Sequence, residues 1–347
     1  MPHPTGARLA AALIGGIVAV QALMLFAFAW PAANSGPREV PIAVAGPPGV
    51  VDQVEQRLAA VPSRDEGVPA FEVVRVADEA AAADAVIGRE TYGAVVLSPE
   101  GPEVVVASAA GPAVAQLLRS AAADLSPEGA SVTVTDIVST TADDPTGSGL
   151  AAGVLPLIMT SAAGGLAVAL LLRRWSLRLV VVGGLAVAGG LVSAAVLHYT
   201  LGVTAGSYWA LAGVLALLIG AVAATVAGLG AVLGRAGGVL GLLLVIFLGN
   251  PLSAAPSAPE LLPQPWGELG QLLPPGAGIS AVRSVSFFDG AAAGGPLLVL
   301  AAWLVAGLGL VALGALGAGR RTNPPNEDGT GTVPDRGTSQ AQPSTRA

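Results

Sequence analysis

The chain has 347 residues, of which 53% are hydrophobic and 11% are charged, and its mean hydropathy is +0.71. Soluble domains carry about 25% charged residues, so this composition indicates an integral membrane protein. All 16 basic residues are Arg, Cys is absent, and the only histidines are His3 and His198. These counts exclude a GxxxxGK[ST] phosphate loop, lysine Schiff bases, thiolate metal sites and most histidine triads, so we expect no enzyme and no cofactor on this chain.

Six apolar runs are long enough, or nearly so, to cross about 30 Å of hydrocarbon as helices, which takes about 20 residues each. The fifth run is the shortest, because Asn250 and Pro251 end it early. The first run could instead be a cleaved signal peptide, but its length favours a retained span. The runs cover residues 9–30, 150–172, 179–201, 208–233, 237–247 with its continuation, and 296–318.

The arginines of the short connections predict the orientation of the spans. If six helices alternate, all of these arginines fall on one side, which the positive-inside rule assigns to the cytoplasm. They are Arg8, Arg173, Arg174, Arg178, Arg235, Arg320 and Arg321. The predicted fold class is therefore an α-helical polytopic protein of the plasma membrane, with six transmembrane helices and both termini inside.

Residues 31–149 are predicted to form an extracytoplasmic α/β domain between the first and second spans. They hold 6 Arg against 17 Asp and Glu, a net charge of −11. Alternating and helical periodicities predict strands at 41–46, 71–78, 92–98, 103–110 and 131–140 and helices at 50–61, 79–90 and 112–125. The remaining divisions are a short cytoplasmic N-terminus at 1–8, the first span at 9–30, a five-helix membrane domain at 150–318, and a disordered cytoplasmic tail at 319–347.

The cores of the spans contain no Asp, Glu, Arg or Lys, which disfavours proton- or ion-coupled transport. His198 lies at the outer end of the third span, where it could anchor the helix at the interface or titrate. Small residues recur in the fourth span and just after it, and such stripes let helices approach closely. Either intramolecular packing or a dimer face would use Gly220, Gly228, Gly230 and Gly234.

The stretch 250–295 contains two short amphipathic pieces, "PWGELGQLL" and "ISAVRSVSFF", neither of which can span. Irregular backbone at membrane depth is tolerated only where protein or water covers its polar groups. We therefore predict a re-entrant or interfacial outer hairpin, with Pro274 and Pro275 starting its second helix and Arg283 facing water, a headgroup phosphate or the helix bundle. An ordinary outside loop is the alternative.

Three segments carry a family resemblance: "VPIAVAGPPGVVDQVEQRL" (40–58), "YGAVVLSPEGPEVVVASAAGPAVAQLL" (92–118), and "LGNPLSAAPSAPELLPQPWGELGQLLPPGAGISAVRSVSFFDG" (248–290). With the order of spans, they resemble the permease subunit of type-2 ABC exporters, in the branch of the YhgE/Pip-like membrane proteins. The resemblance covers roughly residues 8–318.

The resemblance implies export of a lipid, drug, peptide or glycan-like cargo, driven by ATP on a separate cytoplasmic ATPase subunit. It also implies a homodimer or a paired permease, and no nucleic-acid partner. Arg173, Arg174, Trp175 and Arg178 would contact the ATPase, although the same residues suit positive-inside anchors with an interfacial Trp. The hairpin, with Trp266, Pro274, Pro275 and Arg283, would form the outer gate. The alternative function is a receptor or structural envelope protein whose outside domain binds a partner.

Overall fold

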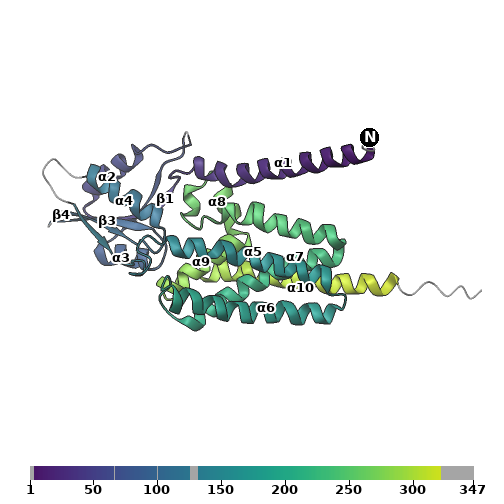
Figure 1. Cartoon of the computed structure of the whole chain (residues 1–347). Helices are drawn as coiled ribbons and strands as arrows, with labels where there is room; N and C mark the ends of the chain where they lie inside the picture. The colour runs from purple at the N-terminus through teal and green to yellow at the C-terminus, as the bar shows by residue number, and fades with distance from the viewer. Residues whose placement is uncertain (1–3, 66, 100, 126–131, 322–347) are drawn as a thin grey trace, which may run out of the picture.

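The computed structural model describes residues 4–65, 67–99, 101–125 and 132–321. An α/β domain lies at one end of a helical bundle, and the long helix α1 (Pro4–Ala33) extends from the junction of the two along one side (Figure 1). The start of α1 and the end of α10 (Gly294–Arg321) both lie at the end of the molecule that is remote from the sheet. The last predicted division, the tail, falls almost entirely on residues 322–347, outside the described part of the chain.

The α/β domain is built on one five-stranded sheet with the strand order β2-β1-β3-β4-β5. β1 pairs in parallel with β2 and β3, β3 and β4 form an antiparallel hairpin, and β5 pairs in parallel with β4. The strands are β1 (Val40–Ala45), β2 (Phe71–Val76), β3 (Gly93–Ser98), β4 (Gly101–Val106) and β5 (Thr133–Asp136).

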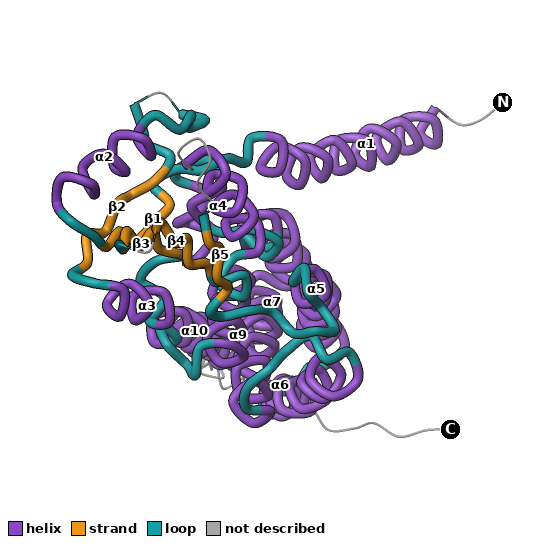
Figure 2. Tube along the Cα trace, turned by 90° about the vertical axis from the view of Figure 1, so that its left-hand side faces the viewer, coloured by secondary structure: helices purple, strands orange, loops and turns teal. Residues whose placement is uncertain are grey.

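Helices cover both faces of this sheet and bury valines and alanines of the central strands β1, β3 and β4. α2 (Pro48–Ala59) and α4 (Pro112–Leu125) pack on one face, where Val44, Val95 and Val104 are buried. α3 (Glu79–Ile87) packs on the opposite face, against alanines of β1 and β3. Figure 2 shows the strand layer with α2 and α4 to one side and α3 to the other.

All eight elements predicted for this domain are present, and three of them end clearly earlier than predicted. α3 ends at Ile87 because the chain turns at Gly88 and enters the left-handed region at Arg89, where φ is 61°. β4 ends at Val106, where residues 107–110 form a turn. β5 covers only four residues, because its last pair, Val106 with Asp136, is also the end of its neighbour β4.

Among the described residues, five helices are long and apolar enough to cross a membrane. The most central of them is α7 (Tyr208–Leu243), which is 78% buried over its most apolar window, whereas α1 is 0% buried. α5 (Ser148–Leu171), α6 (Trp175–Ala195) and α10 pack around α7. Short π-helical turns continue α6 through Val196–Thr200 and α7 through Leu244–Gly249.

The fourth of these five helices reverses direction at Gly234, where φ is 70° and ψ is −153°. After the reversal, Gly238 lies against Gly230, and Gly241 lies against the backbone of Val226. In one straight helix, residues 226 and 241 would be about 22 Å apart at 1.5 Å per residue, so the chain folds back on itself. The sequence divides here into two apolar runs, 208–233 and 237–247, and the structure places residues 235–249 antiparallel to the first run. We call residues 235–249 the returning segment.

The stretch 250–295 folds into short pieces between the returning segment and α10. They are the 3₁₀ turns Pro251–Ser253 and Pro259–Leu261 and the helices α8 (Trp266–Gln271) and α9 (Pro274–Phe287). α9 is largely buried, and α7 and α10 pack against it. The stretch therefore consists of short helical pieces, and its second helix is packed inside the protein. We call residues 250–293 the hairpin.

Candidate functional site: an apolar groove beside helix α1

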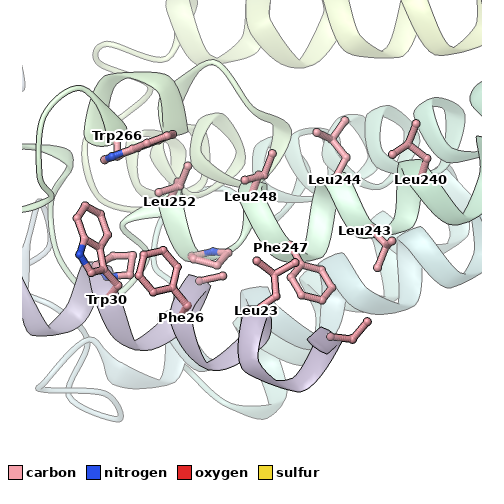
Figure 3. Close-up of a pocket in the computed structure, with 14 residues that line it drawn as sticks. Leu23, Phe26, Trp30, Leu240, Leu243, Leu244, Phe247, Leu248, Leu252 and Trp266 are labelled. Atoms are coloured by element: carbon pink, nitrogen blue, oxygen red, sulfur yellow. The ribbon is translucent and has the colours of Figure 1, made fainter. Parts of the chain in front are cut away.

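A groove of about 580 Å³ lies between α1, the returning segment and the hairpin. Its volume falls within the roughly 300–1,000 Å³ range of small-molecule pockets. All of its lining residues are apolar, and Trp30 and Trp266 lie together at one end of it (Figure 3). The lining consists of Val20, Leu23, Phe26, Ala27, Trp30 and Pro31 from α1, Leu240, Leu243, Leu244, Phe247 and Leu248 from the returning segment, and Pro251, Leu252 and Trp266.

The groove exists because α1 touches the rest of the molecule only near its C-terminal end. There it packs against the π-helical end of the returning segment and the turn that begins at Pro251. Toward its start, α1 diverges from the bundle (Figure 1), and its Leu, Ile and Val side chains are exposed, with Ile17 at 66% and Leu25 at 65%. In a bilayer, these side chains would lie in the hydrocarbon, so acyl chains would have access to the groove.

Arg38 holds the end of α1 at the wall of the groove. Its guanidinium donates to the carbonyl oxygens of Asn34 (3.0 Å), Gly36 (2.9 Å) and Leu261 (3.2 Å), and its Nε donates to Asp65 Oδ2 at 2.5 Å. Arg38 is 2% exposed. The hydrogen bond from Arg38 lowers the pKa of Asp65 below its ordinary value. One side chain thus connects the exit of α1, the α/β domain and the hairpin.

Two backbone hydrogen bonds run parallel to this contact. The amide of Gly36 donates to Leu261 O at 2.9 Å, and the amide of Arg38 donates to Glu260 O at 3.1 Å. Leu261 and Ala258 belong to the hydrophobic core of the α/β domain, with the valines under α2 and α4. The segment around Leu261 is therefore part of the domain's core although it lies more than 200 residues later in the chain.

A second polar contact joins the domain to the hairpin through the segment before β3. The hydroxyl of Tyr92 donates to Glu260 Oε2 at 2.8 Å, and burial raises the pKa of Tyr92. Arg89 donates to Ser280 O at 2.8 Å and to Ser284 Oγ at 2.5 Å, and its guanidinium lies 5.3 Å from the ring centre of Phe288. Burial lowers the pKa of Arg89. Movement of the domain must therefore move the hairpin with it.

The structure places the predicted gate residues at different positions in the hairpin. Trp266 begins α8 and lines the groove, while Pro274 and Pro275 form the first turn of α9, as predicted. Arg283 is buried and donates to Ala255 O (2.6 Å) and Ser257 O (3.3 Å). Water, a headgroup phosphate and the helix bundle were the surroundings predicted for Arg283. In the structure its side chain lies in the interior of the protein. Its role is to hold residues 255–257 against α9.

The predicted coupling residues lie at the connection between α5 and α6, at the end remote from the sheet (Figure 1). Arg173 and Arg174 are exposed, and Trp175 is 50% exposed at the start of α6. Arg178 instead donates to Leu172 O (2.8 Å) and Ala169 O (3.2 Å), so it satisfies carbonyl groups at the end of α5. Its guanidinium is thus already used within the chain.

Three of the four predicted packing glycines lie at close helix contacts within the chain. A Cβ at Gly228 would stand 2.5 Å from Gly307 O of α10, one at Gly230 would stand 2.5 Å from Ala169 Cβ of α5, and one at Gly220 would stand 3.3 Å from Ala186 Cβ of α6. Gly234 differs, because a Cβ there would meet nothing within 4 Å, and its positive φ makes the turn into the returning segment. Its role is conformational, not one of packing.

Sequence reasoning did not identify the groove or the junction that holds α1. The groove arises from residues on α1 and on the returning segment, which are more than 200 positions apart and look like ordinary lipid-facing residues. Arg38 and Tyr92 also belong to no sequence motif that would have marked them as contact residues. A weak signal was available for Arg38, since a charged residue a few positions after a span and directly before a buried strand has few ways to be solvated.

Comparison of the chain with protein-family models, with curated proteins and with solved structures found no match in any of the three.

Proposed function

We propose that the protein is the membrane-embedded permease subunit of an export system of the plasma membrane, which takes up a lipid or a lipid-like drug through the groove beside α1. A separate ATPase subunit would supply the energy. The observation that carries this proposal is the groove itself. It is entirely apolar in its lining, of small-molecule volume, and bounded on one side by a helix whose apolar length is otherwise exposed.

The proposed orientation places the α/β domain outside the cell and both termini inside. It rests on the arginines, because Arg8, Arg173, Arg174 and Arg235 occur where helices begin, connect or turn at the end remote from the sheet. The returning segment would be the fifth of six crossings. At 1.5 Å per residue it rises only about 22 Å, so the buried hairpin would complete that crossing on the outer side.

In this orientation the groove lies at the level of the outer leaflet. Its α1 residues, from Val20 to Pro31, come from the half of α1 nearest the α/β domain. Trp30 and Trp266 would lie at the outer interface, where Trp side chains are favoured in membrane proteins. The groove would therefore hold the apolar part of a cargo while its polar part reaches the junction with the α/β domain.

The ATPase would bind at the opposite end, on the short connection that carries Arg173 and Arg174. Because the guanidinium of Arg178 already caps α5, the contact would fall to these two arginines and to Trp175. The exposed length of α1 leaves room for a second permease chain beside it.

The proposal is tested by purifying the tagged protein from its native membrane in mild detergent, identifying the chains that co-purify and assaying ATP hydrolysis. The Arg173→Ala, Arg174→Ala double variant is expected to lose the ATPase partner. Leu240→Trp, which fills the groove from an exposed position, is expected to keep the partner but to lose cross-linking to a phospholipid with a photoreactive acyl chain. Leu298→Trp, a substitution at an exposed position on α10 outside the groove, is the control.

Absence of any nucleotide-binding chain from cross-linked preparations would overturn the export proposal and favour an envelope protein that acts through its α/β domain. Equal lipid cross-linking in Leu240→Trp and Leu298→Trp would separately remove the groove from the mechanism.

A further inference from the structure

The α/β domain contains a second groove, of about 410 Å³, on the sheet face that α2 and α4 cover. Its floor is a flat apolar surface on the β3–β4 hairpin. Val95 pairs with Val104 and Leu97 pairs with Pro102 across the two strands, so these four side chains stand on the same face. One wall is a face of α2, because Val50, Gln53, Val54 and Arg57 follow the spacing i, i+3, i+4 and i+7.

The position of this groove in the fold is one where α/β proteins bind ligands. β1 and β3 are parallel neighbours, and the chain leaves them in opposite directions, from β1 to β2 and from β3 to β4. In open α/β sheets, ligands bind outside the carboxyl ends of the strands at such a switch point. The groove includes Pro47, just after β1, and Leu97 and Ser98, at the end of β3. It therefore lies at the carboxyl ends of both strands.

The groove faces away from the membrane part of the molecule. The contacts to the hairpin, made by Arg38 and Tyr92, lie just before β1 and just before β3. The groove extends along β3 from Val95 to Ser98, which lie about 10 Å and about 20 Å beyond Tyr92 at 3.3 Å per residue. A ligand in it would arrive from the solution outside the α/β domain and not from the bilayer.

The rim indicates the polarity of the ligand. Its polar residues are Gln53, Arg57 and Ser98, and no acidic residue is among its described lining residues. The two acidic residues of α2, Asp52 and Glu55, are not among the described lining residues, and both form ion pairs with Arg75 of β2. Among the described lining residues the one charged side chain is that of Arg57, and a cationic guanidinium favours a neutral or anionic polar group over a cation.

Prolines make the rim rigid before any ligand binds. Pro47, Pro99 and Pro102 have fixed φ angles and surround the opening. Gly46, with φ at 153°, packs so closely on Leu97 that a Cβ would stand 2.8 Å from the Leu97 side chain. A preformed site loses less entropy on binding than a mobile one.

We propose that this groove is a binding site for a small amphipathic molecule with an apolar body and a neutral or anionic polar end, taken up from the extracytoplasmic solution. The apolar body lies on Val95, Leu97 and Val104, and the polar end lies at Gln53, Arg57 and Ser98. Such a site would make the α/β domain a ligand sensor or acceptor, whether or not the membrane part exports a cargo.

The absence of Cys from the chain allows a local test on the full-length protein in lipid nanodiscs. Single thiols are introduced by Gln53→Cys on the groove wall and, as the matched control, by Gln56→Cys, an exposed position on the same helix outside the groove. The rate of alkylation by N-ethylmaleimide is measured with increasing dodecanoate, and with dodecylamine as the cationic counterpart.

Dodecanoate is expected to slow alkylation of the Gln53→Cys thiol saturably, by about tenfold at ten times its Kd, and to leave the Gln56→Cys thiol unchanged. Dodecylamine is expected to protect more weakly. Val50→Trp, which fills the groove, should abolish protection, while Ile87→Trp on the opposite side of the domain should not. Unchanged rates at both thiols, equal slowing at both, or protection that survives Val50→Trp would each overturn the proposal. The outcome is independent of any ATPase, so it is separable from the export test.

Discussion

Replacing Arg38 by Met should loosen the junction between α1, the α/β domain and the hairpin. Met keeps an unbranched apolar stem of similar length, so the change removes the hydrogen bonds without opening a large cavity. The carbonyl groups of Asn34, Gly36 and Leu261 and the carboxylate of Asp65 lose their charged donor. Hydrogen bonds to charged groups contribute about 1.5–3 kcal/mol each and do not add fully. Since Asp65 is partly exposed and re-solvates, we assign the loss to the carbonyl groups, two of which share one guanidinium nitrogen, and expect about 3 kcal/mol.

The loss is measured by hydrogen exchange of the β1 amides, which reports on the α/β domain itself. Tryptophan fluorescence would not report on this domain directly, because none of the five Trp residues lies in it. At 1.4 kcal/mol per tenfold change, 3 kcal/mol corresponds to roughly 100-fold faster exchange of the β1 amides. Arg75→Met is the matched control: Arg75 also pairs with carboxylates, Asp52 and Glu55, but is 53% exposed. Exposed ion pairs contribute little to stability, so its exchange should change less than about fivefold. If Arg38→Met and Arg75→Met behave alike, the junction does not depend on Arg38.

Three further predictions concern the junction and the bundle. Because the Arg38 contact lowers the pKa of Asp65, the stability it contributes should be complete above the ordinary value of 3.8 and be lost as pH falls through the lower folded pKa. An acid titration of β1 exchange should show this loss in the wild type and not in Asp65→Asn. Tyr92→Phe removes the bond to Glu260 and should destabilise the domain by about 1–2 kcal/mol in denaturant unfolding, whereas Tyr199→Phe, at a 70% exposed position, should be neutral. Gly228→Ala should lower the thermal stability of the bundle in detergent, because its Cβ would meet α10. Gly213→Ala on the same helix has open space and should stabilise by roughly 0.5–1 kcal/mol, so destabilisation by both would refute the packing argument.

Local sequence patterns were sufficient for the secondary structure of the α/β domain. "PIAVAG" and "YGAVVLS" are short β-branched or small apolar runs bounded by Pro, Gly or Ser, and α4 has the bounds 112–125 expected from its helical periodicity. These patterns are local because strand and helix periods are set by backbone geometry. Four of the six apolar runs match one long apolar helix each. The other two, 208–233 and 237–247, fall on the fourth of the five long helices, on either side of the reversal at Gly234.

Only the tertiary structure decided which distant residues meet. The groove beside α1 depends on how α1 diverges from the bundle and on which residues of the returning segment face it, and no sequence motif reveals either. Arg38, Tyr92 and Glu260 are joined by contacts across more than 160 positions, so no local period can reveal them. The surroundings of Arg283 also depended on the fold, since a lone arginine near the interface suits water, a phosphate or buried carbonyl groups equally well. Composition and periodicity therefore determined that the chain enters a membrane and carries an α/β domain, while packing between distant segments decided where its two apolar grooves lie.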